Sequence, residues 1–217
     1  TGVAVTRAGS LLVVEFGRHR LLRVDPATGR AVQVATLVKP WGVAVAPTGS
    51  VYVSDLGWLK RVDAGRAPQI VATADPGVEI GPVAVAPNGD VVYSTVSAVY
   101  RLAHGTGPPQ QLATGTPLAG PHGIAVAADG SVLLSDTGND LVRRIDPAGV
   151  VTAFASVGNP RGIAVAPDGT VAGTTLVADI NPGSGDSGAF GITALGNGKF
   201  LFSADDGIHN TELWVTD

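Results

Sequence analysis

The chain contains no cysteine and no methionine among its 217 residues. Without cysteine it can form neither a disulfide framework nor a thiolate metal site. Without methionine it lacks an initiator, so we expect a mature, trimmed or partial product from which any signal peptide is already missing. No apolar run approaches the roughly 18 residues of a transmembrane helix, which predicts the absence of a membrane span.

Charged residues are also scarce, at 15% of the chain, and the formal net charge is −4 with a pI near 5.5. This balance provides no positive field for a phosphate backbone and argues against nucleic acid as a partner. Lysine is rare relative to arginine, while alanine, glycine, valine and proline are abundant. We take this as the composition of a GC-rich bacterium and expect an extracellular, periplasmic or cell-surface location.

Aromatic residues make up only 5% of the chain, whereas it holds 30 glycines and 15 prolines with a hydrophobic content of 45%. Such a mixture is typical of many short strands joined by tight turns, and it gives little support to helices. All-β closed folds of this length commonly form one domain. The composition therefore predicts a single all-β domain spanning residues 1–217.

One short motif recurs through most of the sequence. It reads GVAV from Gly2 and Gly42, PVAV from Pro82, and GIAV from Gly123 and Gly162, so successive copies lie about 40 residues apart. A period of this length that contains four strand-like runs is the signature of the blades of a β-propeller. The repeat predicts five or six four-stranded antiparallel blades around a ring, with irregular last blades.

A single repeat shows why the copies must pack together. Its four apolar runs span 123–128, 131–136, 141–146 and 150–155, and a glycine-containing turn joins the first two. The first run alternates Ile or Val with Ala and is apolar on both faces, so both faces must be covered. Neighbouring sheets arranged radially would cover them.

The phrase P-x-G-I-A-V-A-x-D-G-S-V-x-x-S-D-x-G-N, carried by residues 121–139, resembles the NHL repeat of bacterial propellers. The resemblance extends over about residues 1–167. It is specific for fold and poor for function, because similar propellers include scaffolds, sensor ectodomains, RNA binders, lactonases and lyases.

Residues 168–217 follow a different pattern, opening on DGT and closing on ELWVTD, and resemble one ELWxxDGT-type repeat that would complete the ring. The next first-strand match begins at Gly191, less than three quarters of a period after Gly162, so about two strands are missing. The run at 174–180 matches the fourth-strand phrase of residues 69–74 and not a second strand, and counting it predicts 21 strands in six units. A fusion of two repeat types, an internal gap or a fragment completed by another chain would explain the junction, and an incomplete blade would permit self-association.

Antiparallel pairing places the residue before each first strand at the same end of a blade as the acid after the second strand. We expect this end to bind a protein or a small polar ligand. The candidate residues, which include those of the following loops, are Trp41, His122, Arg161, Glu15, Asp55, Asp136, His19 and Asn139. The alternative is that each Asp caps a turn by accepting backbone N–H groups, as a periodically repeated acid would.

No catalytic cluster interrupts the repeat, so the sequence favours a non-enzymatic binding or scaffold module without a cofactor. The alternative is a metal-dependent propeller enzyme. Resemblance to an SMP-30-like lactonase would imply Ca²⁺ in the central channel, with Glu15, Asp55, Asp136 and Asn139 as the available ligands. Resemblance to a streptogramin lyase would imply a divalent metal with His122 and His19.

Overall fold

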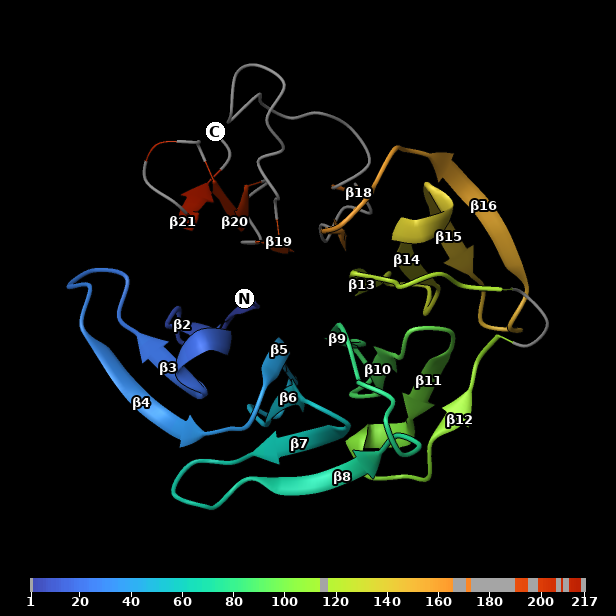
Figure 1. Ribbon diagram of the computed structural model, residues 1–217. Helices are drawn as coiled ribbons and strands as arrows, with labels where there is room; N and C mark the ends of the chain where they lie inside the picture. The colour runs from blue at the N-terminus through green and yellow to red at the C-terminus, as the bar shows by residue number, and fades with distance from the viewer. Residues whose placement is uncertain are drawn as a thin grey trace.

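The computed structural model describes residues 2–113, 117–165, 171–172, 190–194, 199–205, 208 and 211–215. Within them the chain forms six antiparallel sheets, each built from consecutive strands, that lie around a central axis (Figure 1). This arrangement confirms the predicted all-β propeller with four-stranded blades. Over the described residues the six sheets contain 21 strands, which equals the predicted total although the predicted strand at 174–180 is not among them.

Within each sheet the strands follow one another in chain order, with the first strand nearest the axis and the last farthest from it. The first sheet holds β1 (Val3–Val5), β2 (Leu11–Glu15), β3 (Arg20–Val24) and β4 (Ala31–Thr36). The second holds β5 (Pro40–Val45), β6 (Val51–Asp55), β7 (Trp58–Val62) and β8 (Gln69–Thr73). The third holds β9 (Val83–Val85), β10 (Val91–Ser94), β11 (Val99–Leu102) and β12 (Gln110–Gln111). The fourth holds β13 (Gly123–Val126), β14 (Val132–Asp136), β15 (Leu141–Ile145) and β16 (Val151–Ser156).

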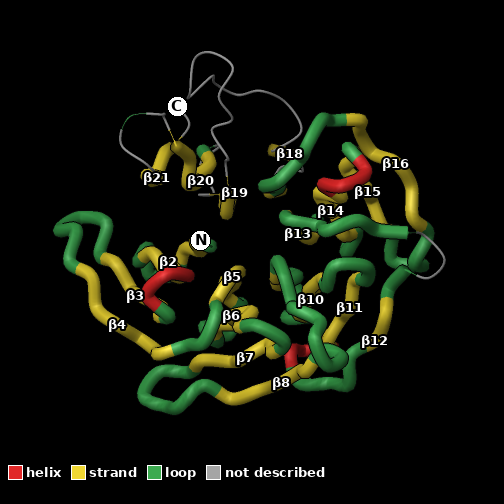
Figure 2. The backbone as a smooth tube through the Cα atoms, viewed as in Figure 1, coloured by secondary structure: helices red, strands yellow, loops and turns green. Residues whose placement is uncertain are grey.

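The last two sheets are smaller. One pairs β17 (Ala164–Val165) with β18 (Val171–Ala172), and the other holds β19 (Phe190–Ala194), β20 (Phe200–Asp205) and β21 (Thr211–Val215). The strand β18 is not among the predicted strands, and the predicted run at 174–180 lies outside the described residues. Helical structure within the described ranges is limited to the 3-10 turns η1 (Phe16–Arg18), η2 (Ala103–Gly105) and η3 (Thr137–Asn139), visible in Figure 2.

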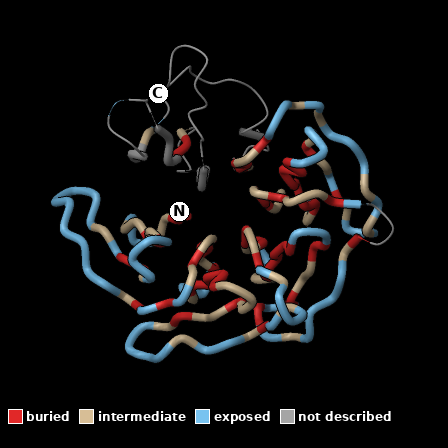
Figure 3. The backbone as a smooth tube through the Cα atoms, viewed as in Figure 1, coloured by how far each residue is buried: buried red, intermediate tan, exposed pale blue. Residues whose placement is uncertain are grey.

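The inner strands close the ring. Contacts run from β1 to β5, from β5 to β9, from β9 to β13, from β13 to β17, from β17 to β19, and from β19 back to β1. Each inner strand therefore touches the inner strands of both neighbouring sheets. Burial decreases from the axis outward. The inner strands are largely buried, whereas the outermost strands β4, β8 and β16 are mostly exposed (Figure 3).

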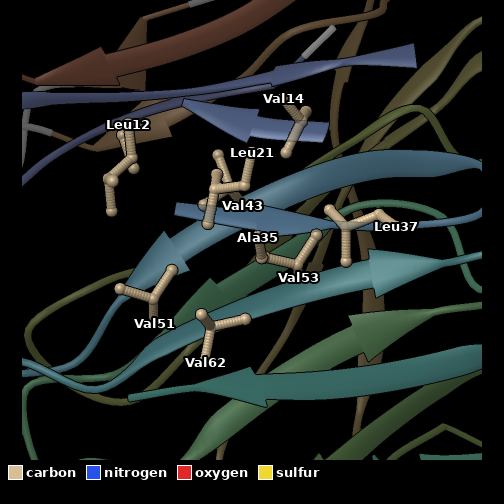
Figure 4. Packing of buried hydrophobic residues seen from close by; sticks show 10 residues of the cluster. Leu12, Val14, Leu21, Ala35, Leu37, Val43, Val51, Val53 and Val62 are labelled. Carbon is tan, nitrogen blue, oxygen red and sulfur yellow. The ribbon is translucent and has the colours of Figure 1, made fainter. Parts of the chain in front are cut away.

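Apolar side chains fill the space between neighbouring sheets. Between the first and second sheets, Leu12 and Val14 of β2 and Leu21 of β3 pack in one cluster with Val53 and other valines of the second sheet (Figure 4). Leu12, Val14, Leu21 and Val53 are completely buried. Burial of each such side chain stabilises the fold by about 1.5–3 kcal/mol. The expectation that each sheet covers its neighbour is confirmed.

The glycine of the recurrent motif allows the closest approach between sheets. A Cβ on Gly123 would lie 2.3 Å from the carbonyl oxygen of Arg161, and one on Gly2 would lie 2.8 Å from that of Trp41. Both distances are shorter than van der Waals contact allows, so a larger residue would push the neighbouring inner strand away. The absence of a side chain at these positions lets the ring narrow and places the residues before each glycine at the mouth of the channel.

Candidate functional site

A cavity of about 270 Å³ opens at the end of the channel where the first strands begin. A second cavity of about 280 Å³ continues along β1, β5, β9, β13 and β17, lined by their valine, isoleucine and alanine residues. The two cavities share five lining residues, namely Val3, Val43, Val83, Ile124 and Ile163. They are therefore successive parts of the central channel, and the polar side chains gather at its mouth.

Three of the predicted site residues line this mouth together. Trp41, His122 and Arg161 each stand immediately before the first-strand glycine, in the second, fourth and fifth sheets. The third sheet has Gly81 at the equivalent position. The residues of the first strand are thus nearly constant from repeat to repeat, whereas the position before its glycine carries three different functional groups. These groups meet because the ring places them at one opening of the channel.

Phe16 also lines the mouth cavity, and the sequence analysis missed it. It begins the 3-10 turn η1 directly after β2, and the residue is 41% exposed. The ammonium group of Lys39 lies 5.7 Å from the centre of the Phe16 ring. The signal in the sequence was an aromatic residue placed after the acid of the second strand, where the other repeats have smaller residues.

His122 is partly buried and held on two sides. Its ring centre lies 5.5 Å from that of Trp41, at an interplanar angle of 41°. Its Nδ1 lies 3.0 Å from the Oγ1 of Thr137. Burial and the positive charge of Arg161 lower the pKa of His122 from its ordinary value of 6.5, and a backbone hydrogen bond to Gly120 opposes them in part. His122 is therefore neutral at pH 7.

The two aspartates of the predicted site are buried in the blades. The carboxylate of Asp55 accepts the N–H of Val38 at 2.8 Å, the N–H of Lys39 at 2.6 Å, and the ammonium of Lys60 at 2.6 Å. Its side chain is completely buried. The carboxylate is saturated by a loop and by the third strand of its own sheet, so it holds the blade together.

Asp136 repeats this arrangement in the fourth sheet. It is completely buried, accepts the N–H of Ala119 at 2.8 Å and forms an ion pair with Arg143. Asn139 donates to Asp136 at 2.8 Å and to the carbonyl of Pro117 at 3.2 Å. These contacts match the alternative reading of the sequence, in which the repeated acid caps a loop.

The remaining candidates lie near the mouth and outside its lining. Glu15 accepts a hydrogen bond from Arg20 and forms a longer ion pair with Arg18. The ring of His19 is exposed, and its Nδ1 contacts the carbonyl oxygen of Val38. The structure thus brings Trp41, His122 and Arg161 together at the cavity and assigns Glu15, Asp55, Asp136, His19 and Asn139 to contacts within and between loops.

The donor set of the mouth does not suit a metal ion. Over the part of the chain that the structure describes, no three His, Asp or Glu side chains lie together as a possible metal site. A Ca²⁺ ion takes six to eight oxygen ligands, yet the described lining offers one imidazole, one guanidinium and no carboxylate. The set suggested for Ca²⁺, Glu15 with Asp55, Asp136 and Asn139, is not formed, and His19 lies outside the lining that contains His122.

No helix in the described part of the chain is long and apolar enough to cross a membrane.

No protein-family model matches the chain, and no curated protein matches it. Solved structures do match, and they are β-propeller proteins. Virginiamycin B lyase from Staphylococcus aureus has a TM-score of 0.74 and 14% identity, covering 98% of this chain and 83% of the lyase chain. A further structure is of a catalytically inactive histidine-to-alanine variant of that lyase with quinupristin, covering 100% of this chain and 65% of that one at a TM-score of 0.66 and 12% identity.

Two other similar structures are associated with sugar-acid chemistry or calcium. A gluconolactonase from Xanthomonas campestris has a TM-score of 0.75 and 18% identity, covering 99% of this chain and 84% of that chain. The calcium-binding protein regucalcin from Agrobacterium tumefaciens has a TM-score of 0.77 and 15% identity, covering 98% and 88%. Identities this low show the fold, which is that of a propeller with NHL-like repeats. None of the comparisons supports the ELWxxDGT-type repeat predicted at 168–217.

The prediction of a non-enzymatic binding or scaffold module is wrong on this comparison, because the similar structures include a lyase and a gluconolactonase. The prediction rested on the lack of a cluster that interrupts the repeat. That cluster is dispersed in the sequence, since Trp41, His122 and Arg161 occur in three different repeats and meet only when the ring closes. The comparison favours the enzyme of the alternative reading over a scaffold, whereas the metal that this reading included has no donor set in the described lining.

Proposed function

We propose that the chain is a propeller enzyme of the lyase type, with its active site at the mouth of the channel. The observation that carries the proposal is His122, a neutral imidazole that shares a cavity with the guanidinium of Arg161. A neutral histidine can accept a proton from carbon, and a nearby cation can stabilise the negative charge that develops on an adjacent carbonyl. The described donor set favours this chemistry over calcium-dependent lactone hydrolysis.

In the proposed reaction the imidazole of His122 takes a proton from a carbon atom next to a substrate carbonyl. The electron pair of the C–H bond forms a carbon–carbon double bond, and the bond to the leaving oxygen breaks with its electron pair on that oxygen. Arg161 stabilises the charge on the carbonyl, and Trp41 and Phe16 contact apolar parts of the substrate. The proton then passes from His122 to the leaving oxygen. The elimination therefore consumes neither water nor an oxidant.

The similar lyase structure with quinupristin supplies a first substrate to test, together with other cyclic esters. An elimination that opens a ring leaves the mass unchanged, whereas hydrolysis adds one water, so mass spectrometry separates the two reactions. We expect ring opening without a change in mass. His122→Gln should reduce kcat by about 10²- to 10⁴-fold, the usual contribution of a positioned acid–base group.

The matched control is His104→Asn. His104 is exposed, contacts the carbonyl of Asn88 in a turn at the opposite end of the blade, and has a φ of 49°, which asparagine tolerates. This variant should retain full activity. Products heavier by one water, calcium-dependent opening of gluconolactone, or full activity of His122→Gln would overturn the proposal.

A further inference from the structure

The hydroxyl of Thr137 lies at the centre of a small buried network behind His122. Its Oγ1 is 3.0 Å from the Nδ1 of His122, 2.6 Å from the carbonyl oxygen of Pro160 and 3.4 Å from that of Ser135. Thr137 is 9% exposed, so water does not compete freely for these contacts. The hydroxyl has one proton to donate, and two of its three neighbours are carbonyl oxygens, which only accept.

The proton of the Thr137 hydroxyl is therefore donated to a carbonyl, and the 2.6 Å contact identifies Pro160 as the acceptor. Its lone pair is then available to accept a hydrogen bond from His122. This requires the proton of the neutral imidazole to be on Nδ1, which leaves Nε2 unprotonated. The tautomer of a histidine is set in this way by the partner of one ring nitrogen.

The same hydroxyl connects two loops that carry functional side chains. Pro160 directly precedes Arg161, and the backbone N–H of His122 donates to the carbonyl of Ser135 at 3.2 Å. The loop before β13 and the loop before β17 are thus both tied to residues 135–137. One side chain fixes the relative positions of the two groups proposed to act on substrate.

Thr137 is not needed to build a blade. The residue that follows the second-strand position is Phe16 in the first repeat, Leu56 in the second and Val96 in the third. None of these has a hydroxyl. Among the first four repeats, the hydroxyl at this position occurs only in the one that carries the histidine, as expected of a positioning residue.

We propose that Thr137 is a positioning residue that fixes His122 in the Nδ1–H tautomer, so that Nε2 is the nitrogen that accepts the substrate proton. The tautomer is inferred from the contacts of the Thr137 hydroxyl with His122 and Pro160. The expected effect of the tautomer on turnover rests on the proposed function, in which His122 is the base. The two parts are tested by different measurements, so failure of one is distinguishable from failure of the other.

The tautomer is measured in the free protein by long-range ¹H–¹⁵N NMR spectra of the imidazole side chains, in which the protonated and unprotonated ring nitrogens have distinct shifts. His122→Gln assigns the His122 signals by their loss. We expect the wild type to have a protonated Nδ1 and an unprotonated Nε2 above the pKa of His122. A wild-type spectrum with the proton on Nε2 would overturn the inference without any variant.

Thr137→Val removes the hydroxyl at nearly constant volume, and Thr137→Ser restores it. We expect Thr137→Val to lose the exclusive Nδ1–H state and Thr137→Ser to keep it. In the lyase assay kcat should fall at least about tenfold in Thr137→Val with little change in KM, because a wrong tautomer removes the base and leaves binding intact. Thr137→Ser should recover most of the loss.

Thr95→Val is the matched control for structural damage. Thr95 is also buried, and its hydroxyl accepts the N–H of Ala98 at 3.2 Å in the third sheet. The Thr95→Val variant should have a lower melting temperature and an unchanged His122 tautomer. If Thr137→Val leaves the tautomer unchanged, or Thr95→Val changes it equally, Thr137 is not a positioning residue. A tautomer shift in a protein without lyase activity would support the positioning role and reject the proposed function.

Discussion

The rings of Trp41 and His122 lie 5.5 Å apart although they belong to the second and fourth sheets. The third sheet lies between them and has Gly81, which has no side chain, at the equivalent position. A Cβ added at Gly81 would lie in ordinary contact, 3.6 Å from the carbonyl oxygen of Pro121, the residue before His122. Burial and the charge of Arg161 disfavour the imidazolium form of His122.

Removal of the charge at Arg161 should raise the pKa of His122. Arg161→Gln eliminates the second-largest cause of the shift and leaves burial, the largest, in place. We therefore expect the pKa of His122 to rise and to stay below 6.5, with the acidic limb of the pH–rate profile moving to higher pH. NMR titration of the imidazole measures the pKa, and Arg161→Lys, which keeps the charge, is the control. An equal rise in both variants would contradict an electrostatic cause.

His122 should also make stability depend on pH. Its pKa is lower in the folded state than in the unfolded state, so between the two values the unfolded chain binds more protons. The free energy of unfolding should thus fall as the pH drops below about 6.5 and level off below the folded pKa. Urea denaturation of the wild type and His122→Gln between pH 5 and pH 8 measures the difference, which should shrink towards acid pH. If the difference in the free energy of unfolding between the two proteins did not change with pH, titration of His122 would not contribute to stability.

The ion pair of Asp136 with Arg143 should contribute strongly to stability. Asp136 is completely buried, and the Arg143 side chain is 15% exposed. Asp136→Asn would leave the guanidinium without its counter-charge and should lower the free energy of unfolding by about 3–5 kcal/mol.

Asp129→Asn is the control for this substitution. It disrupts an ion pair with Arg144 in which both side chains are about half exposed, so water screens the pair and we expect a much smaller loss than for Asp136→Asn. Urea denaturation of both variants gives the comparison. Equal losses would show that burial of Asp136 does not determine its contribution.

The repeat predicts the propeller because each unit contains its own strands and turns, which are local features of the sequence. It also predicts that Trp41, His122 and Arg161 share one end of the channel, because equivalent positions in stacked sheets lie at the same level. It does not predict which acids face the channel. Asp55 and Asp136 lie at strand ends, and the loops that fold back over them, at Val38 and Ala119, decide their direction.

The contact between Thr137 and Pro160 is equally hidden from the sequence. It joins neighbouring sheets through loops whose paths depend on tertiary packing. The role of the first-strand glycine is hidden for the same reason, since the carbonyl that excludes a side chain there belongs to the next repeat. The period thus predicts which positions share one end of the ring, whereas individual contacts between two repeats depend on loop paths that the sequence does not reveal.

Gly123→Ala should test this packing between repeats directly. The added methyl group would lie 2.3 Å from the carbonyl oxygen of Arg161 and 3.0 Å from both the backbone nitrogen of Ile163 and the hydroxyl of Ser135. Because two of these atoms are backbone, the inner strand β17 must move, and we expect a loss of about 1–3 kcal/mol in the free energy of unfolding. The displacement would also carry Arg161 away from His122 and raise the pKa of the imidazole. Gly158→Ala, where an added Cβ meets nothing within 4 Å, should leave both quantities nearly unchanged. A Gly123→Ala protein as stable as the wild type, with the same His122 pKa, would mean that the sheets do not need this close approach to form the mouth.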